Sequence, residues 1–258
     1  MVVSNDGRAH ELNEVSWWSR WVETTWLDED SYVFISREFD EGFFNRAGFV
    51  RVPRDAEKSL GLIEKEFERW GRPPRIFVRQ DRNHPRLLRA LAGAGYRIAD
   101  QMAVMEVESP SFAVNHDVEL VVGVEGNPEE WADTYLMAFY GEKSQLKPVM
   151  RVLESLSGAK DVSLMLARLN GRAAGCLALF RSDKVCGAYC VGTRPEFRRM
   201  NVASTMLDLS RKLAANEGRR LILQTILSDS LEAFYLKLGF ARLYLKDMFV
   251  KDTGRVAR

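Results

Sequence analysis

Residues 188–206 read AYCVGTRPEFRRMNVASTM, and this stretch changes from strand-like to helix-like halfway along. Its first residues form an apolar run typical of a strand, which Thr193-Arg194-Pro195 interrupts. Helical spacing then relates the apolar residues Val202, Met206, Leu209 and Leu213. The stretch therefore predicts a strand, a turn and a helix, in that order.

The start of this predicted helix has the properties of an anion-binding site. First-turn backbone N–H groups lack partners within a helix, and the macrodipole adds partial positive charge there. Arg198 and Arg199 bring two further positive charges, while the small residues Ala203 and Ser204 leave room beside the first turn. We therefore expect a phosphate group here. The alternative is an ordinary strand–turn–helix with a solvated basic turn.

The same residues carry a resemblance to a known family. The stretch is similar to the acetyl-CoA-binding motif of the GNAT superfamily of N-acyltransferases, a strand and then Val-x-x-x-Pro-x-x-Arg, followed by Arg/Gln-x-x-Gly-x-Gly/Ala. Val191, Pro195 and Arg198 stand at matching positions, and Asn201 replaces the usual glycine. Because asparagine tolerates left-handed backbone angles, we expect the loop geometry to be kept.

The resemblance implies which residues bind the coenzyme. Backbone amides of the turn would bind the coenzyme A diphosphate, and amides near Cys190 and Val191 would bind pantetheine or the developing oxyanion. The implied cofactor-binding residues are Cys190, Val191, Thr193, Arg198, Arg199, Met200, Asn201, Val202, Ala203, Ser204 and Ser228. No metal ion is expected, because the three cysteines form no cluster with histidine.

A second stretch supports the same family. Residues 228–240 read SDSLEAFYLKLGF, which resembles Asn-x-x-Ala-x-x-x-Tyr-x-x-x-Gly-Phe of the GNAT superfamily. Tyr235 matches in place, whereas Ser228 and Leu231 replace the usual residues. The resemblance implies that Tyr235 is the general acid that protonates the leaving thiolate, since a phenol with a pKa of about 10 keeps its proton at neutral pH. The alternative is a tyrosine that packs on the sheet.

No general base stands out in the sequence. Glu142 is a candidate near the acceptor, although a solvated loop acid is the commoner interpretation. Asp183 lies in a predicted hairpin turn, and His84 and His116 lie at a helix start and in a linker. Cys190 has no adjacent histidine or cation in the sequence, so a buried strand cysteine is favoured over a nucleophile.

The chain reads as two copies of one fold. The same predicted order occurs twice: a short strand, a helix, a glycine followed by an aromatic residue, and a longer strand. It runs from residues 76–78 through Gly95-Tyr96, and again from residues 221–223 through Gly239-Phe240. We therefore expect an α+β fold of two tandem GNAT-like domains, each a mixed, mostly antiparallel central sheet flanked by helices.

The predicted domains are a degenerate copy at residues 1–115 and an N-acetyltransferase domain at residues 116–258. Asp55 stands at the helix start of the first copy, where its charge would repel a diphosphate. Only the second copy is therefore predicted to bind coenzyme A. The first copy would supply structure, cover the acceptor or contribute acceptor specificity.

Composition limits the partners. The 258 residues carry a net charge of +1, with 46% hydrophobic and 28% charged residues, as in soluble globular proteins. This balance gives no electrostatic case for nucleic acid or an anionic membrane. The first residues lack the basic start and apolar core of a signal peptide, and three cysteines do not form a disulfide framework. A cytoplasmic protein is expected.

Together these features predict an N-acetyltransferase that uses acetyl-CoA as co-substrate. An acceptor, either a small molecule or a peptide, would attack the thioester directly with its primary amine, without a covalent enzyme intermediate. Two alternatives stay open: a non-catalytic coenzyme-binding sensor or regulatory module, and a structural interaction protein. The identity of the acceptor and the existence of a homodimer also stay open.

Overall fold

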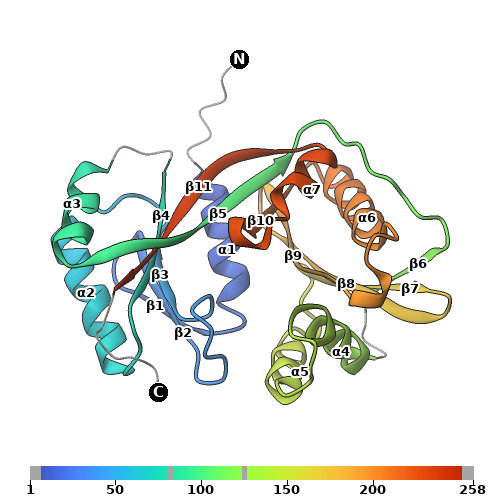
Figure 1. The fold of residues 1–258 in the computed structure, drawn as a ribbon, viewed down its shortest axis with the longest axis horizontal. Helices are drawn as coiled ribbons and strands as arrows, with labels where there is room; N and C mark the ends of the chain where they lie inside the picture. Colours follow the sequence, from blue (N-terminus) through green and yellow to red (C-terminus); the bar gives the residue numbers. More distant parts are fainter. Residues whose placement is uncertain (1–6, 81–83, 124–126, 252–258) are drawn as a thin grey trace. The chain divides into compact units, whose positions relative to one another are not determined.

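The computed structural model describes residues 7–80, 84–123 and 127–251 (Figure 1). Its contacts divide the chain into two compact units. The first unit contains the described parts of Met1–Val104 and Arg242–Arg258, together with Thr225–Glu232. The second unit contains the described part of Met105–Gln224, together with Ala233–Ala241. Each unit is therefore built from separate stretches, whereas the domains predicted at residues 1–115 and 116–258 are continuous.

The first unit is a mixed sheet with helices. Its strands follow the order β1 (Glu23–Trp26), β2 (Ser31–Ile35), β3 (Arg46–Phe49), β4 (Arg75–Arg79), and then most of β11 (Phe240–Lys251) and of β5 (Tyr96–Val107). The β1–β2 and β2–β3 pairs are antiparallel, β3 and β4 are parallel, and β11 is antiparallel to β4. Its helices are α1 (Arg8–Trp18), α2 (Ala56–Arg69) and α3 (Pro85–Gly93).

The core of the first unit lies between the sheet and the apolar faces of two helices. Ile63 and Phe67 of α2 and Leu91 of α3 are fully buried, as is Ile76 of β4. Asp55 begins α2, because its side chain accepts a hydrogen bond from the backbone N–H of Lys58 at 3.0 Å. The acid predicted at this helix start is thus an N-cap.

The second unit contains a largely antiparallel sheet. Its strands follow the order most of β10 (Arg220–Ile226), β9 (Val185–Thr193), β8 (Arg172–Arg181), β7 (Val162–Leu169) and β6 (Val118–Val122). Its helices are α4 (Pro128–Phe139), α5 (Leu146–Ser155), α6 (Val202–Asn216) and most of α7 (Glu232–Lys237). The sequence Asn170-Gly171 between two apolar runs predicts a tight hairpin. The two residues join β7 to β8 with φ angles of 53° and 73°, so this prediction is confirmed.

The predicted α+β class, with mixed and mostly antiparallel sheets flanked by helices, is confirmed. The same order of elements occurs in β1–β5 and again in β7–β11. Each begins with antiparallel strands and continues with a helix, a parallel strand, a second helix and a last strand. Gly95 and Gly239 precede the two last strands with φ angles of 83° and 87°. Duplication remains a prediction, which this shared order supports.

Three local predictions from the sequence need correction: a helix-like opening segment that includes Trp26, a last helix over residues 230–238, and a frayed tail over residues 251–258. Trp26 lies on β1 and is 44% exposed, because Thr24 and Thr25 favour a strand that pairs with β2. The last helix begins at Glu232 and not at Ser230, whose φ of 59° is left-handed. Lys251, predicted to belong to a frayed tail, ends β11 and pairs with Glu64 at 2.6 Å.

Some expectations fall outside the described part of the chain. The tail over residues 252–258 and the expected absence of a signal peptide at residues 1–6 concern residues that the structure does not describe. Within residues 7–80, 84–123 and 127–251, none of the helices is both long and apolar enough to cross a lipid bilayer.

Candidate functional site

Strand β9 contains a bulge at the first of the predicted coenzyme residues. Cys190 and Val191 together oppose the single residue Leu177 of β8. Cys190 has a φ of 52°, which is uncommon for a residue other than glycine, and its carbonyl accepts a hydrogen bond from the thiol of Cys176 at 3.5 Å. A bulge interrupts the ladder and re-aims backbone groups, a feature frequent beside active sites.

Strands β9 and β10 part before they reach the bulge. Their parallel pairing ends at Gly187 and Ile222, although β9 continues to Thr193 and β10 to Ile226. The backbone of β9 around Cys190 is therefore not paired with β10. Family resemblance predicts pantetheine between two strands that separate in this way.

The turn between β9 and α6 presents a row of backbone N–H groups. Arg199 and Asn201 have left-handed φ angles of 64° and 56°, and Asn201 is the N-cap of α6. Within the described residues, the six amides of residues 199–204 have no hydrogen-bond acceptor, and the Asn201 side chain does not cap the helix. Unpaired amides at a helix start are a binding site for anions. Asn201 thus takes the left-handed conformation expected of it.

The side chains of this turn are mostly at the surface. Arg198, Arg199, Met200 and Asn201 are exposed, Val202 and Ser204 are buried, and Thr193 and Ala203 are half-buried. Arg198 donates from Nη2 to the carbonyl of Ala138 at 3.2 Å and from Nε to the carbonyl of Thr193 at 3.4 Å. Its guanidinium therefore links the turn to the last turn of α4.

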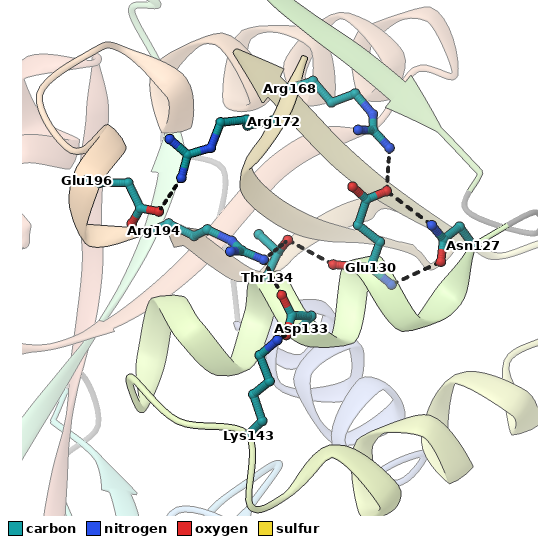
Figure 2. A network of polar contacts seen from close by, with 9 residues as sticks. All are labelled: Asn127, Glu130, Asp133, Thr134, Lys143, Arg168, Arg172, Arg194 and Glu196. Atoms are coloured by element: carbon teal, nitrogen blue, oxygen red, sulfur yellow. Dashed lines mark hydrogen bonds and ion pairs between the residues drawn. The ribbon is translucent and has the colours of Figure 1, made fainter. Parts of the chain in front are cut away.

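An ion-pair network also holds α4 against the end of β9 (Figure 2). The carboxylate of Asp133 pairs with Arg194 and with Lys143, and Arg194 lies 3.4 Å from the hydroxyl of Thr134. Burial opposes ionisation, but the hydrogen bonds from Lys143 and Arg194 hold the pKa of Asp133 below its ordinary value. The wider network contains Asn127, Glu130, Arg168, Arg172 and Glu196.

Sequence reasoning missed this network. Arg194 lies directly before the proline of the motif, but its partner Asp133 stands 61 positions away. The spacing of residues in the sequence shows which side chains lie together on one helix or strand, but not which side chains of different elements are in contact. The sequence offers an acid on α4 and an arginine directly after β9, which together do not specify a contact.

Aromatic rings at the end of α4 lie beside the bulge. The ring of Tyr135 is 5.0 Å from that of Phe139 and stacks on Trp131 at 5.7 Å. A Cβ atom on Gly192 would come within 2.9 Å of the Phe139 ring, so glycine allows this close approach. Phe139 is 52% exposed and Tyr140 is 37% exposed. The bulge therefore adjoins a partly exposed aromatic surface.

The two remaining predicted site residues lie elsewhere in the chain. Tyr235 on α7 is buried, and its ring meets Phe240 edge-on at 5.9 Å. Ser228 is exposed in a short 3₁₀ helix, Leu227–Asp229, that belongs to the first unit, whereas the other predicted residues belong to the second. The roles of both residues remain predictions.

The residues considered for acid–base or nucleophilic chemistry differ in their exposure to solvent. Glu142 is exposed after α4 and accepts a hydrogen bond from Ser144 at 3.0 Å. His116 and Asp183 are exposed, and His84 is buried directly before α3. Burial raises the pKa of the Cys190 thiol well above its usual value, so the thiol stays protonated and is a poor nucleophile.

Among residues 7–80, 84–123 and 127–251, His, Cys, Asp and Glu side chains form no group of three or more that could hold a metal ion.

Comparison with known proteins finds a family model that matches the region of the candidate site. Residues 127–240, which contain both sequence motifs, match the model of the acetyltransferase (GNAT) family. Among solved structures, the chain is similar to a GCN5-related N-acetyltransferase from Kribbella flavida, with 19% identity, coverage of 95% of this chain and 96% of that chain, and a TM-score of 0.69. No curated protein sequence matches the chain.

Two further solved structures have a similar fold. A functionally unknown conserved protein from Staphylococcus epidermidis shares 16% identity, with coverage of 93% of this chain and 99% of that chain and a TM-score of 0.66. A tandem GNAT protein from the clavulanic acid biosynthesis pathway shares 11% identity, with coverage of 88% and 84% and a TM-score of 0.62. At these identities the likeness concerns the fold alone.

Proposed function

We propose, from the GNAT-family domain that residues 127–240 form, that this protein is an N-acetyltransferase. It transfers an acetyl group from acetyl-CoA to a primary amine of a small molecule or peptide. The amine attacks the thioester directly, and no acyl-enzyme forms. The buried, protonated thiol of Cys190 agrees with the absence of a covalent intermediate.

One observation carries this proposal: the amides of residues 199–204 have no acceptor within the described part of the chain. Backbone donors at a helix start that have no acceptor within the protein favour a bound anion. A diphosphate supplies several acceptor oxygens and two negative charges. The exposed guanidinium of Arg199 would add a charge-assisted contact.

The bulge and the tyrosine supply the remaining roles. Acetyl-CoA brings an activated thioester carbonyl. The re-aimed backbone of Cys190 and Val191 would orient the pantetheine arm and donate to the developing oxyanion. Tyr235 would give its phenolic proton to the leaving thiolate. The rings of Phe139 and Tyr140 beside the bulge would form part of the acceptor surface.

The first unit is not proposed to bind the coenzyme. Its corresponding helix, α2, begins with Asp55, whose carboxylate already accepts the N–H of Lys58. A negative charge at this position opposes a second anion. The three cysteines are buried and unpaired, which fits a reducing cytoplasm.

The test is an acetyl-transfer assay on the purified full chain. Acetyl-CoA is incubated with a mixture of polyamine, amino-acid, aminoglycoside and peptide amines, and release of free coenzyme thiol is followed. We expect amine-dependent thiol release that falls by about 100-fold or more in Tyr235→Phe, with the coenzyme dissociation constant unchanged. Coenzyme binding without turnover for any amine would favour a sensor module instead. Failure of acetyl-CoA to raise the melting temperature would favour a structural protein.

A further inference from the structure

The stretch between β5 and β6 contacts the turn between β9 and α6. Residues 108–117 form this stretch, which belongs entirely to the second unit (Figure 1). The sequence predicts a domain boundary here, after Asn115. In the structure, Asn115 Nδ2 donates a hydrogen bond to the carbonyl of Met200 at 3.0 Å, and the Asn115 backbone N–H donates to the hydroxyl of Thr205 at 2.9 Å. The stretch therefore touches the turn on both sides of Asn201.

This stretch is anchored on both sides of Asn115. On one side, the backbone N–H groups of Glu108 and Ser109 donate to the carbonyl of Gly239 at 3.0 and 3.1 Å. A Cβ atom on Gly239 would clash with the carbonyl oxygen of Ser109, so glycine allows the close approach. On the other side, the N–H of Asp117 donates to Asn115 Oδ1 at 2.9 Å, directly before β6 pairs with β7. Asn115 is thus held in place by contacts outside the turn.

The turn has its carbonyl groups bonded, whereas its amides have no acceptor within the described chain. Asn115 holds the carbonyl of Met200, and the carbonyl of Asn201 accepts from Thr205 Oγ1 at 2.8 Å and from the Thr205 N–H at 2.9 Å. In a planar trans peptide, the N–H points away from the carbonyl of the preceding residue. Bonding these two carbonyls therefore directs the amides of Asn201 and Val202 away from the protein groups that hold them.

We propose that Asn115 and Thr205 are positioning residues that hold this turn in the shape that binds the coenzyme diphosphate. The inference rests on the proposed function, because it concerns the same site. Arg199 and Asn201 have left-handed φ angles, which are unfavourable for residues other than glycine, so the shape needs support from outside the turn. A turn that is already formed binds its ligand without the cost of being ordered. Neither positioning side chain needs to touch the coenzyme.

The experiment is a calorimetric titration of the full chain and its variants with coenzyme A. Thr205 is buried, and Thr205→Val keeps its shape while removing the hydroxyl that joins Asn115 to Asn201. We expect this variant to bind coenzyme A about tenfold more weakly, as the loss of one hydrogen bond to an ionic ligand would. Thr205→Ser keeps the hydroxyl and should bind within about twofold of the wild type.

A second pair of variants tests Asn115 against a matched control. Asn115→Ala should also weaken binding about tenfold. Asn127→Ala is the control, because Asn127 lies in the same unit and its Oδ1 accepts the N–H of Glu130 at 3.2 Å at the start of α4. This control should lower the melting temperature and leave coenzyme affinity within about twofold of the wild type. In the acetyl-transfer assay, Asn115→Ala should raise the KM for acetyl-CoA and leave kcat unchanged.

The outcomes distinguish failure of this inference from failure of the proposed function. A wild type that does not bind coenzyme A would overturn the proposed function and this inference with it. A wild type that binds, with equal affinity in Thr205→Val or Asn115→Ala, would overturn this inference alone. Equal weakening in Thr205→Val and Thr205→Ser, or in Asn115→Ala and Asn127→Ala, would also overturn it, because the effect would then follow packing or general stability.

Discussion

The left-handed conformation of Asn201 makes a quantitative prediction. Asn201 has a φ of 56°, and its side chain makes no cap hydrogen bond, so its main contribution is the backbone shape. A β-branched residue in this conformation costs about 1–2 kcal/mol, whereas glycine costs nothing sterically. We therefore expect Asn201→Val to lower the melting temperature by roughly 2–8 °C and Asn201→Gly to leave it unchanged or higher.

The same change should also affect the coenzyme. A displaced residue 201 misplaces the amides on either side, so Asn201→Val should weaken coenzyme A binding by about tenfold or more, as the loss of one ionic hydrogen bond would. Asn170 offers a matched control, because it is also left-handed, with a φ of 53°, in the β7–β8 hairpin. Asn170→Val should cost similar stability and leave coenzyme affinity within about twofold of the wild type.

Thermal unfolding and calorimetric titration measure both quantities on one protein sample. Equal stability of Asn201→Val and Asn201→Gly would refute the role given to the backbone. Equal loss of coenzyme affinity in the Asn201 and Asn170 variants would refute the role given to the turn, because the effect would then follow general stability.

Three further predictions concern charges. Asp133→Asn should lower the free energy of unfolding by about 1 kcal/mol at neutral pH. The folded pKa of Asp133 lies below its ordinary 3.8, so this contribution is present above pH 3.8 and is lost as the pH falls through the folded pKa. The unfolding free energies of wild type and variant, measured over a series of acidic pH values, should therefore converge. Lys246→Met should destabilise the protein by about 3–5 kcal/mol in urea unfolding. In the wild type the Lys246 ammonium lies 2.7 Å from the buried carboxylate of Glu11 and 2.6 Å from that of Glu14, and the substitution removes this cation from both. A neutral or stabilising result would contradict this prediction. Calorimetry should give one coenzyme A per chain, and two would contradict the role of Asp55 as an anion-repelling cap.

Local patterns predicted much of the second unit. The Asn-Gly hairpin, the strand–turn–helix of residues 188–206 and the left-handed Asn201 all depend on interactions within a few residues. Backbone angles and helical spacing are local properties, so a sequence carries them directly. The bulge at Cys190 was not predicted, because it depends on which residues of β8 lie opposite.

Long-range contacts account for what the sequence did not predict. Lys246 near the C-terminal end of the described chain is buried with Glu11 and Glu14 of α1, and sequence separations of more than 230 positions leave no local signal. Burial would raise the pKa of Glu14, but Lys246 and Arg46 lower it overall. The placement of β11 beside β4 has the same cause, because strand partners are chosen by tertiary packing.

The most direct test of coenzyme binding at the turn between β9 and α6 is a measurement on the double variant Arg198→Glu/Arg199→Glu. It compares the dissociation constant of coenzyme A for this variant with that for the wild type. Both side chains are exposed, so the variant should fold, with a loss of about 1 kcal/mol from the hydrogen bonds of Arg198 to the carbonyls of Thr193 and Ala138. Two reversed charges beside the amides of residues 199–204 should weaken binding by about 100-fold, and added salt should reduce the difference. An unchanged dissociation constant would mean that coenzyme A does not bind at this helix start.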